Sequence, residues 1–267
     1  MPSFAETMTL MAVFTDDDMG RPWKWRVEGP ELEVRDGYHR SLEAELAQLA
    51  SIESGVAATE PITAMAEAQR ALGRALGLVA GQPEDLLDLQ PAPADWPLRE
   101  VMRHMLETEL SFLANTRWSV TRGEDQPVAM PKEMRPKDQD APGGGTISDL
   151  AARLVAARAT TDAFISELQA SDLGRPSIWA GYSVDVRFRL HRFASHLTEH
   201  TIQVEKVLRS AGRHPAEARQ MVRAIWAARG GHERQSPAGT LARLDQEHTD
   251  RLESLRSVLL SGGRPQP

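Results

Sequence analysis

The sequence predicts an all-α fold from residue 38 onward, preceded by a small irregular segment that contains short strands. Beyond residue 38, apolar residues recur in long stretches at helical spacing, as they do along the buried face of a helix. No strong strand–turn–strand pattern is recognisable in that part of the chain. Neither a strand-preceded GxGxxG nor a GxxxxGK followed by Ser or Thr occurs, which argues against the glycine-rich nucleotide-binding folds.

The composition is that of an ordinary globular protein. The chain has 267 residues, of which 41% are hydrophobic and 26% charged, with a formal net charge of -7. Phosphate binding needs concentrated positive charge, so nucleic acid is not expected as a partner. No apolar stretch reaches the roughly 20 residues that cross a bilayer, and the N-terminus lacks the basic region of a signal peptide. We therefore expect a cytoplasmic protein that does not bind membranes.

The first part of the chain is the least regular. Residues 7–14 are apolar and predict a short strand, and residues 23–25 and 32–34 predict others, with glycine and proline between them. Helical spacing begins at about residue 38 and continues to about 52. A second helix is expected after Pro61, running to about residue 79.

Proline and glycine then separate the later elements. At the end of the proline-rich residues 91–97, Asp95 is a typical helix cap and Pro97 suits a first helical turn. This predicts a helix that runs to about residue 118. The polar residues 121–146 are expected to form a loop. Further helices are predicted at about 149–168, 186–210, 216–229 and 241–260.

Two histidines on the helix predicted at 186–210 point to metal chemistry. His196 and His200 are four residues apart, so they share one helix face and can both reach a single ion. Gln203 continues along the same face. The alternative for such a pair is a solvated or hydrogen-bonded role without a metal.

A third histidine lies on the helix predicted after Pro97. His104 belongs to a stripe of small or polar side chains that also includes Thr108, Ser111 and Asn115. A lone histidine in such a place is more often a satisfied core residue. Two helices that both offer histidines inward, however, match the way in which helical bundles build metal sites.

Other polar residues are weaker candidates for the same site. Glu107, Glu109, Glu199 and Gln203 are candidates to hydrogen-bond the histidine ligands or a bound water. Gln203 is favoured among them, because Glu199 lies about 100° around the helix from His200. Arg189 and Arg192 could hold a substrate carboxylate, although surface salt bridges are the expected role. The remaining histidines are expected off the ligand face or in solvent: His39, His191, His214, His232 and His248.

Two segments resemble a known family. Residues 95–109, DWPLREVMRHMLETE, resemble the second helix of DinB-like proteins, in which a tryptophan and a short helical turn precede a metal-binding histidine. Residues 190–206, LHRFASHLTEHTIQVEK, resemble the fourth helix of that family, with its HxxxH pair. The resemblance covers about residues 60–212.

The resemblance implies a DinB/YfiT-like four-helix bundle at 61–212, in which His104, His196 and His200 bind one divalent cation. Residues 1–60 are then an N-terminal extension of short strands plus a helix, and residues 213–267 form additional C-terminal helices that pack on the bundle. The family is similar to mycothiol-dependent maleylpyruvate isomerase and to the bacillithiol S-transferases. It is also similar to the iron-binding domain of sulfoxide synthases, whose second catalytic domain this chain is too short to include.

The function expected from these observations is a metal-dependent enzyme that acts on a small molecule. Three neutral imidazoles leave a cation with an open position, which is typical of catalytic rather than structural sites. The ligands suit Zn²⁺, Ni²⁺ or Fe²⁺. The resemblance favours a reaction of the S-transferase or isomerase type that uses an external low-molecular-weight thiol. The alternative is a non-catalytic metal-binding or stress protein with the same bundle. A homodimer is also expected.

Overall fold

The computed structural model describes residues 2–25, 31–55, 59–213 and 215–261. Contacts between Cα atoms divide the chain into two compact units. Unit 1 comprises Met1–Val56, Gly73–Gly81 and His214–Pro267, and unit 2 comprises Ala57–Leu72 and Gln82–Arg213. Every helix that the structure describes is too short or too polar to cross a membrane.

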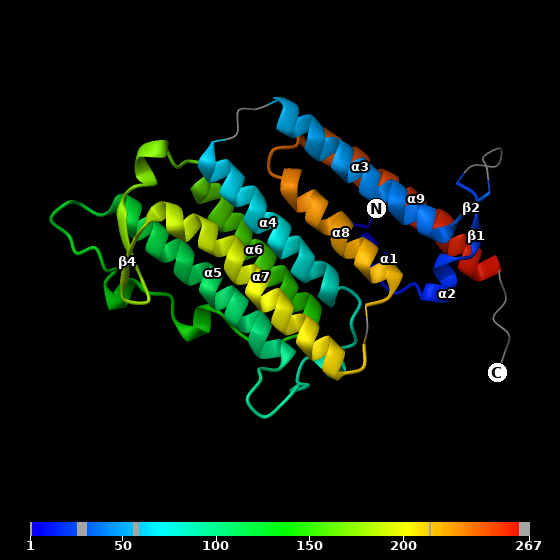
Figure 1. The fold of residues 1–267 in the computed structure, drawn as a ribbon, viewed down its shortest axis with the longest axis horizontal. Helices are drawn as coiled ribbons and strands as arrows, with labels where there is room; N and C mark the ends of the chain where they lie inside the picture. The colour runs from blue at the N-terminus through cyan, green and yellow to red at the C-terminus, as the bar shows by residue number, and fades with distance from the viewer. Residues whose placement is uncertain (1, 26–30, 56–58, 214, 262–267) are drawn as a thin grey trace. The chain divides into compact units, whose positions relative to one another are not determined.

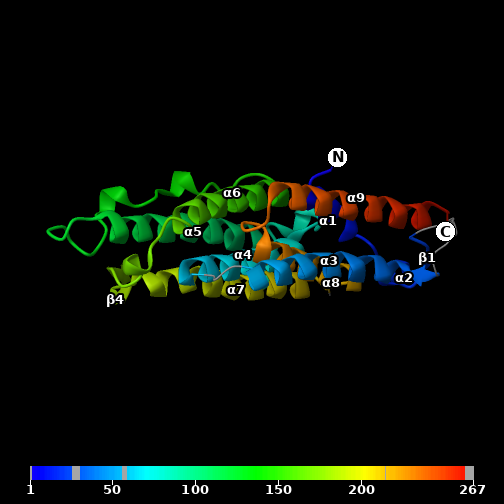
Figure 2. The same cartoon turned by 90° about the horizontal axis from the view of Figure 1, so that it is seen from above.

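Unit 2 contains a four-helix bundle, as the sequence predicted. Its helices are α4 (Glu60–Val79, of which residues 60–72 belong to this unit), α5 (Leu98–Thr121), α6 (Ile147–Ile165) and α7 (Val186–Ser210). Short 3₁₀ turns lie between them at Glu84–Leu86, Lys132–Met134, Asp138–Asp140 and Ala170–Asp172. In Figure 2, α5 and α6 form one layer of the bundle and α4 and α7 the other. Figure 1 shows the same helices side by side.

Apolar residues from all four helices, including Ile165 of α6, meet in the core of the bundle. Met65 of α4, Phe112 of α5 and Phe193 of α7 belong to one buried cluster. The Phe112 and Phe193 rings meet edge to face, with their centroids 5.4 Å apart, an arrangement that aromatic pairs prefer. This contact holds α5 against α7 one turn away from His196.

A β-hairpin in unit 2 was not predicted. Strands β3 (Pro176–Trp179) and β4 (Tyr182–Asp185) pair antiparallel and lead directly into α7. Ala180 and Gly181 form the turn with φ values of 48° and 86°, the left-handed geometry that two-residue hairpin turns need. The expectation of no strand–turn–strand beyond residue 38 was therefore wrong, because strands of four residues leave little alternation to detect. Asp185 then caps α7, accepting a hydrogen bond from the Phe188 N–H.

Unit 1 is also helical. Its elements are α1 (Phe4–Met11), α2 (Asp16–Met19), β1 (Pro22–Trp23), β2 (Leu32–Glu33), α3 (Val34–Gly55), α8 (Glu217–His232) and α9 (Ala238–Ser261), together with the end of α4. Strands β1 and β2 pair antiparallel. Helix α3 packs against α8 and α9, and α1 against α9 and α8. Figure 1 shows α3, α8 and α9 running alongside one another.

The strand predicted at residues 7–14 was wrong, since α1 occupies most of it. Ser3 accepts a hydrogen bond from the Glu6 N–H, and the Glu6 carboxylate accepts one from the Ser3 N–H. This capping box satisfies two backbone donors that a helix start leaves free. Met8 and Met11 are fully buried on the inner side of the helix. An apolar run of this length is ambiguous, and here the cap favours the helix.

Helix α4 approaches α8 very closely within unit 1. A Cβ atom at Gly73 would lie 2.5 Å from the Trp226 carbonyl oxygen, and one at Gly77 would lie 2.5 Å from the Arg223 Cα. Only glycine permits backbones to come this near to each other. Helix α4 thus supplies residues to both units. The division predicted at residues 60 and 212, and the packing of the C-terminal helices on the bundle, remain predictions.

Candidate metal centre

Helix α5 positions the first of the three histidines. Val101, one turn before His104, and Met105, the residue directly after it, are both buried and hold this part of α5 in the bundle. The His104 side chain is 30% exposed. The start of the helix differs from the expectation: Pro97 is the cap, and Asp95 instead pairs with Lys206 of α7, Oδ1 to Nζ, at 2.7 Å.

Helix α7 positions the other two. Its bounds, Val186–Ser210, agree with those predicted. Phe193, Leu197 and Val204 are at most 2% exposed and hold this face inward. His196 and His200 share that face, each 7% exposed. The four-residue spacing therefore brings both rings into the bundle rather than to solvent.

The three imidazoles meet at one place between α5 and α7. One ligand nitrogen from each of His104, His196 and His200 lies within 4.8 Å of the others. The His200 Nε2 and His196 Nε2 atoms are 2.8 Å apart. No carboxylate belongs to this group among the residues that the structure describes. The donor set is thus three imidazole nitrogens, which suits a divalent metal of the Zn, Ni or Fe type.

Gln203 determines which nitrogen of His200 faces the group. The Gln203 Oε1 atom lies 2.7 Å from the His200 Nδ1. An amide oxygen only accepts hydrogen bonds, so the His200 Nδ1 carries the proton and its Nε2 carries the lone pair. The His200 Nε2 therefore accepts from the His196 Nε2–H in the metal-free protein. Gln203 thus prepares His200 as an Nε2 ligand.

Burial keeps two of the rings neutral. Loss of solvation, followed by the charges of His200 and His104, lowers the pKa of His196 to about 3. Burial and the charge of His200 also lower the pKa of His104. Neutral imidazole is the form that binds a metal. Neither ring therefore has to lose a net proton before it binds a cation at neutral pH.

Aromatic rings surround the histidines. The Trp96 ring meets His104 edge-on at 4.9 Å and stacks on His200 at 6.2 Å, measured between centroids. Phe112 lies 5.5 Å from His196 on the bundle side. Trp96 is 45% exposed and so borders the solvent. The site therefore has an apolar inner wall and an indole at its outer edge.

The other polar candidates are not hydrogen-bonded to the three histidines. Glu109 is buried against Arg158, with its Oε1 3.3 Å from the Arg158 Nη1, and does not face the histidines. Glu199 accepts hydrogen bonds of 2.6 and 2.8 Å from Arg192, which is the surface pairing expected of it. Glu107 Oε2 lies 3.7 Å from the His104 Nδ1, beyond hydrogen-bonding distance. Of the four candidates, Gln203 alone is hydrogen-bonded to one of the three histidines.

Arg189 and Arg192 both bind other parts of the chain. Arg189 is buried and donates to the Ser177 hydroxyl at 2.5 Å and to the Ile178 carbonyl, so it holds the hairpin onto α7. Burial lowers the pKa of Arg189 to about 10. Arg192 pairs with Glu199 and lies over the Trp179 ring at 5.5 Å. Neither guanidinium is directed at the three histidines by these contacts.

The remaining histidines divide into two groups. His39 and His191 have side chains that are 48% exposed, as expected of residues outside the site. His232 and His248 are completely buried, so the expectation that they lie in solvent was wrong. Both of them contact Glu45, a residue that the sequence did not single out. His214 lies outside the described residues.

Sequence reasoning also missed a buried ion-pair network in the bundle. Arg158, 1% exposed, bonds Glu109 and Asp162, and its guanidinium lies 4.6 Å from the centre of the Phe193 ring. The spacing of Arg158 and Asp162 looks like an ordinary surface pair. Nothing in the local pattern distinguishes it from one. Burial raises the pKa of Glu109, against the opposing charge of Arg158.

Comparison with known proteins identifies the family. The model of the DinB superfamily matches residues 67–204, which is more than half of the 267 residues. The chain belongs to the DinB superfamily. The matched residues include α5 and residues 186–204 of α7, with all three histidines. The predicted family and fold class are thereby confirmed for this DinB protein.

A solved structure is also similar. YfiT from Bacillus subtilis, described as a probable metal-dependent hydrolase with an unusual four-helix bundle topology, is 14% identical, with a TM-score of 0.46. The match covers 60% of this chain and 93% of YfiT. No curated protein matches the chain.

Proposed function

We propose that His104, His196 and His200 bind one divalent cation, and that the protein is a metal-dependent enzyme acting on a small molecule with the help of a low-molecular-weight thiol. The observation that carries the metal proposal is the convergence of three imidazole nitrogens within 4.8 Å of one another. A cation bound there keeps its full charge and lowers the pKa of a water or thiol at its open position.

The residues of the chain have separate tasks in this proposal. Gln203 holds the His200 ring so that its Nε2 points at the cation. Phe112 excludes water on the inner side, which strengthens the electrostatic attraction between the cation and an anionic ligand. Trp96 borders the open side, where a substrate would contact the indole. The chain has no cysteine, so a thiol would come from outside.

Metal analysis of purified protein tests the ligand set. We expect about one equivalent of Zn²⁺, Ni²⁺ or Fe²⁺ in the wild type, and less than about a tenth of that in His104→Ala, His196→Ala and His200→Ala. His191→Ala is the matched control, because His191 is on the same helix but 48% exposed and directed at Glu60. Equal metal content in all five proteins would refute the site.

A cobalt-substituted protein tests the thiol. Titration with L-cysteine should produce a thiolate-to-cobalt charge-transfer band in the wild type, and His196→Ala should show none. An unchanged cobalt spectrum would contradict thiol binding and would favour the non-catalytic alternative. The cobalt titration thus tests thiol binding separately from the ligand set, and the homodimer expected from the sequence stays a prediction.

A further inference from the structure

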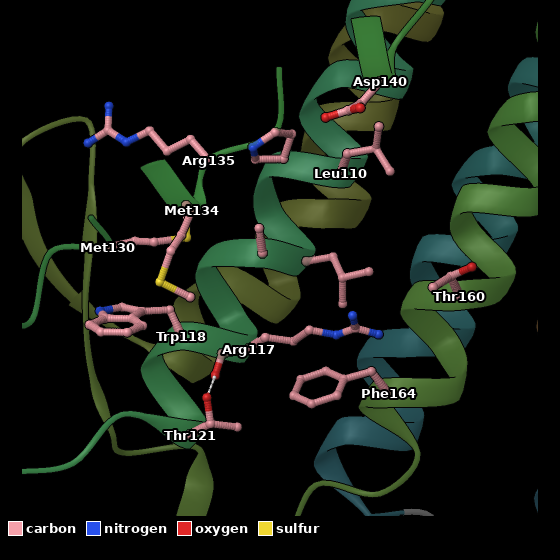
Figure 3. Close-up of a pocket in the computed structure, with 13 residues that line it drawn as sticks. Leu110, Arg117, Trp118, Thr121, Met130, Met134, Arg135, Asp140, Thr160 and Phe164 are labelled. Atoms are coloured by element: carbon pink, nitrogen blue, oxygen red, sulfur yellow. Dashed lines mark hydrogen bonds between the residues drawn. The ribbon is translucent and has the colours of Figure 1, made fainter. Parts of the chain in front are cut away.

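A second place in unit 2 has the properties of a ligand site. A pocket of about 660 Å³ lies between α5, α6 and the segment of residues 130–140 (Figure 3). Pockets for small molecules commonly have volumes of about 300–1,000 Å³. The apolar side chains that line it are Leu110, Leu113, Trp118, Met130, Met134 and Phe164.

This pocket is separate from the three histidines. Leu113 follows His104 by nine residues on α5, which places the two on opposite sides of the helix at about 100° per residue. His104 faces α7, whereas the pocket is completed by Thr160 and Phe164 of α6. A ligand in the pocket would therefore not touch the histidines.

Most of the pocket wall consists of apolar side chains that are buried in the bundle. Leu113, Trp118 and Met130 are at most 8% exposed. The Trp118 Nε1–H donates to the Pro127 carbonyl at 3.1 Å. The single polar atom of this indole is thus satisfied by the loop, and the ring offers an apolar surface. Met134, at the rim, is 53% exposed.

One charged group lies across this apolar wall. In Figure 3 the Arg117 side chain extends from α5 toward Phe164 of α6. Its guanidinium carbon is 5.2 Å from the centre of the Phe164 ring. Among the described residues, no carboxylate forms an ion pair with Arg117.

Four other arginines of the bundle, in contrast, have a carboxylate partner. Arg99, Arg103, Arg158 and Arg192 each bind a carboxylate of the chain itself. Arg117 is exposed, and it borders an apolar pocket rather than a polar surface. A planar guanidinium with its donors available matches a carboxylate geometrically and in charge.

The other charged groups of the lining do not neutralise Arg117. Asp140 is the one carboxylate among the lining residues, and its Oδ2 accepts the Lys137 backbone N–H at 2.8 Å as the cap of a 3₁₀ turn. Arg135 also lines the pocket, but its side chain points away from Arg117 in Figure 3. The two arginines and one aspartate leave the pocket with a net positive charge.

We propose that this pocket binds a small amphiphilic monocarboxylate, with its alkyl or aryl part against Leu113, Trp118 and Phe164 and its carboxylate on the Arg117 guanidinium. The apolar wall supplies the binding energy for the body of the ligand. The unpaired arginine selects an anion over a neutral head group of the same size. The site is independent of the proposed metal.

Calorimetric titration with octanoate, octan-1-ol and octylamine tests this selection. We expect octanoate to bind the wild type at least tenfold more tightly than octan-1-ol, and octylamine to bind more weakly than either. Arg117→Met, which keeps the length of the side chain and removes its charge, should lose that preference. Arg135→Met is the matched control and should keep it.

Two further variants keep the test decisive. Ala114→Phe directs a ring into the pocket and should abolish octanoate binding, with folding verified by circular dichroism. His196→Ala should bind octanoate like the wild type. Equal affinities for octanoate and octan-1-ol, or an Arg117→Met protein with unchanged preference, would overturn the proposal.

Discussion

Two groups of histidines in this protein differ in what faces them. In unit 2, the ring nitrogens of His104, His196 and His200 face one another. In unit 1, His232 and His248 face a carboxylate: their Nε2 atoms each lie 2.6 Å from a different oxygen of Glu45. All three residues of this second group are fully buried.

In the second group, the Glu45 carboxylate satisfies both histidines without an external ion. Burial raises the pKa of Glu45, but hydrogen bonds from His232 and His248 and the charge of Arg229 outweigh it and lower the pKa to about 2. Glu45 is therefore ionised and accepts both Nε2–H groups. The other nitrogen of His232 lies 3.0 Å from the Ser236 hydroxyl. No nitrogen of His232 is left for an external ion.

The difference teaches that burial of histidines does not by itself indicate a metal site. What matters is whether an anion of the chain already satisfies the rings. Three converging nitrogens without a carboxylate can satisfy one another only partly, whereas a divalent cation accepts all three lone pairs. A buried carboxylate with two imidazoles and an arginine is instead an internal ion pair that joins α3, α8 and α9.

Removal of the Glu45 carboxylate should have the largest effect on the free energy of unfolding. Glu45→Gln leaves the buried Arg229 without one of its two anions and both histidines without a charged acceptor. We expect a loss of about 3–5 kcal/mol in the free energy of unfolding, measured with urea. Glu67→Gln, which removes a carboxylate that is 51% exposed beside His191, should cost less than about 1 kcal/mol. Similar losses in the two variants would contradict the internal ion pair.

Adding or removing a metal should change the stability of the protein only through His104, His196 and His200. At a free metal concentration about 100 times the dissociation constant, binding to the native state stabilises it by about 2.7 kcal/mol. We expect wild type and Glu45→Gln to gain this stability when Zn²⁺ is added after chelation, and His196→Ala to gain none. Differential scanning calorimetry measures the shift. A gain in His196→Ala would show that the cation binds elsewhere.

Gln203 should control the metal affinity without being a ligand. Loss of a partner that orients a ligating histidine commonly weakens metal binding by about 10–100-fold. Gln203→Leu should fall in this range in a chelator competition assay. Gln203→Glu retains an oxygen acceptor for the His200 Nδ1–H and should restore the affinity. If Leu and Glu variants bind the metal equally, the Gln203 contact has no role in orientation.

The two groups should respond to acid in different pH ranges. The pKa of His196 is about 3 in the folded chain and about 6.5 in the unfolded one, so the unfolded state binds protons first. Stability of the metal-free protein is then present above pH 6.5 and lost as the pH falls toward 3. For Glu45, whose folded pKa is about 2, loss begins only below about pH 4.5.

Urea unfolding of metal-free protein between pH 8 and pH 5.5 measures the effect of His196 without that of Glu45. Wild type should lose about 1 kcal/mol over this interval through His196. His196→Ala should lose less, and Glu45→Gln should lose as much as the wild type. An equal loss in wild type and His196→Ala would mean that His196 does not resist protonation in the fold.

Much of the three-histidine site could be predicted because its main signal is local. The spacing of His196 and His200 places both on one face of any helix, and the bounds of α7 followed from its apolar pattern. The position of His104 opposite them depended on the resemblance of residues 95–109 to the DinB family. Burial of Glu109, in contrast, was not predictable, because a glutamate in a helix gives no local sign of an arginine from another helix.

What the sequence by itself determined is the set of helices and the faces on which their histidines lie, since periodicity and caps act within a few residues. The tertiary structure alone decided which histidines meet other histidines and which meet Glu45. His248 and His200 each lie in a long helix rich in charged residues. Glu45 is 203 residues before His248 in the chain. A contact over that separation forms only when α3 and α9 pack together, so no local pattern could encode it.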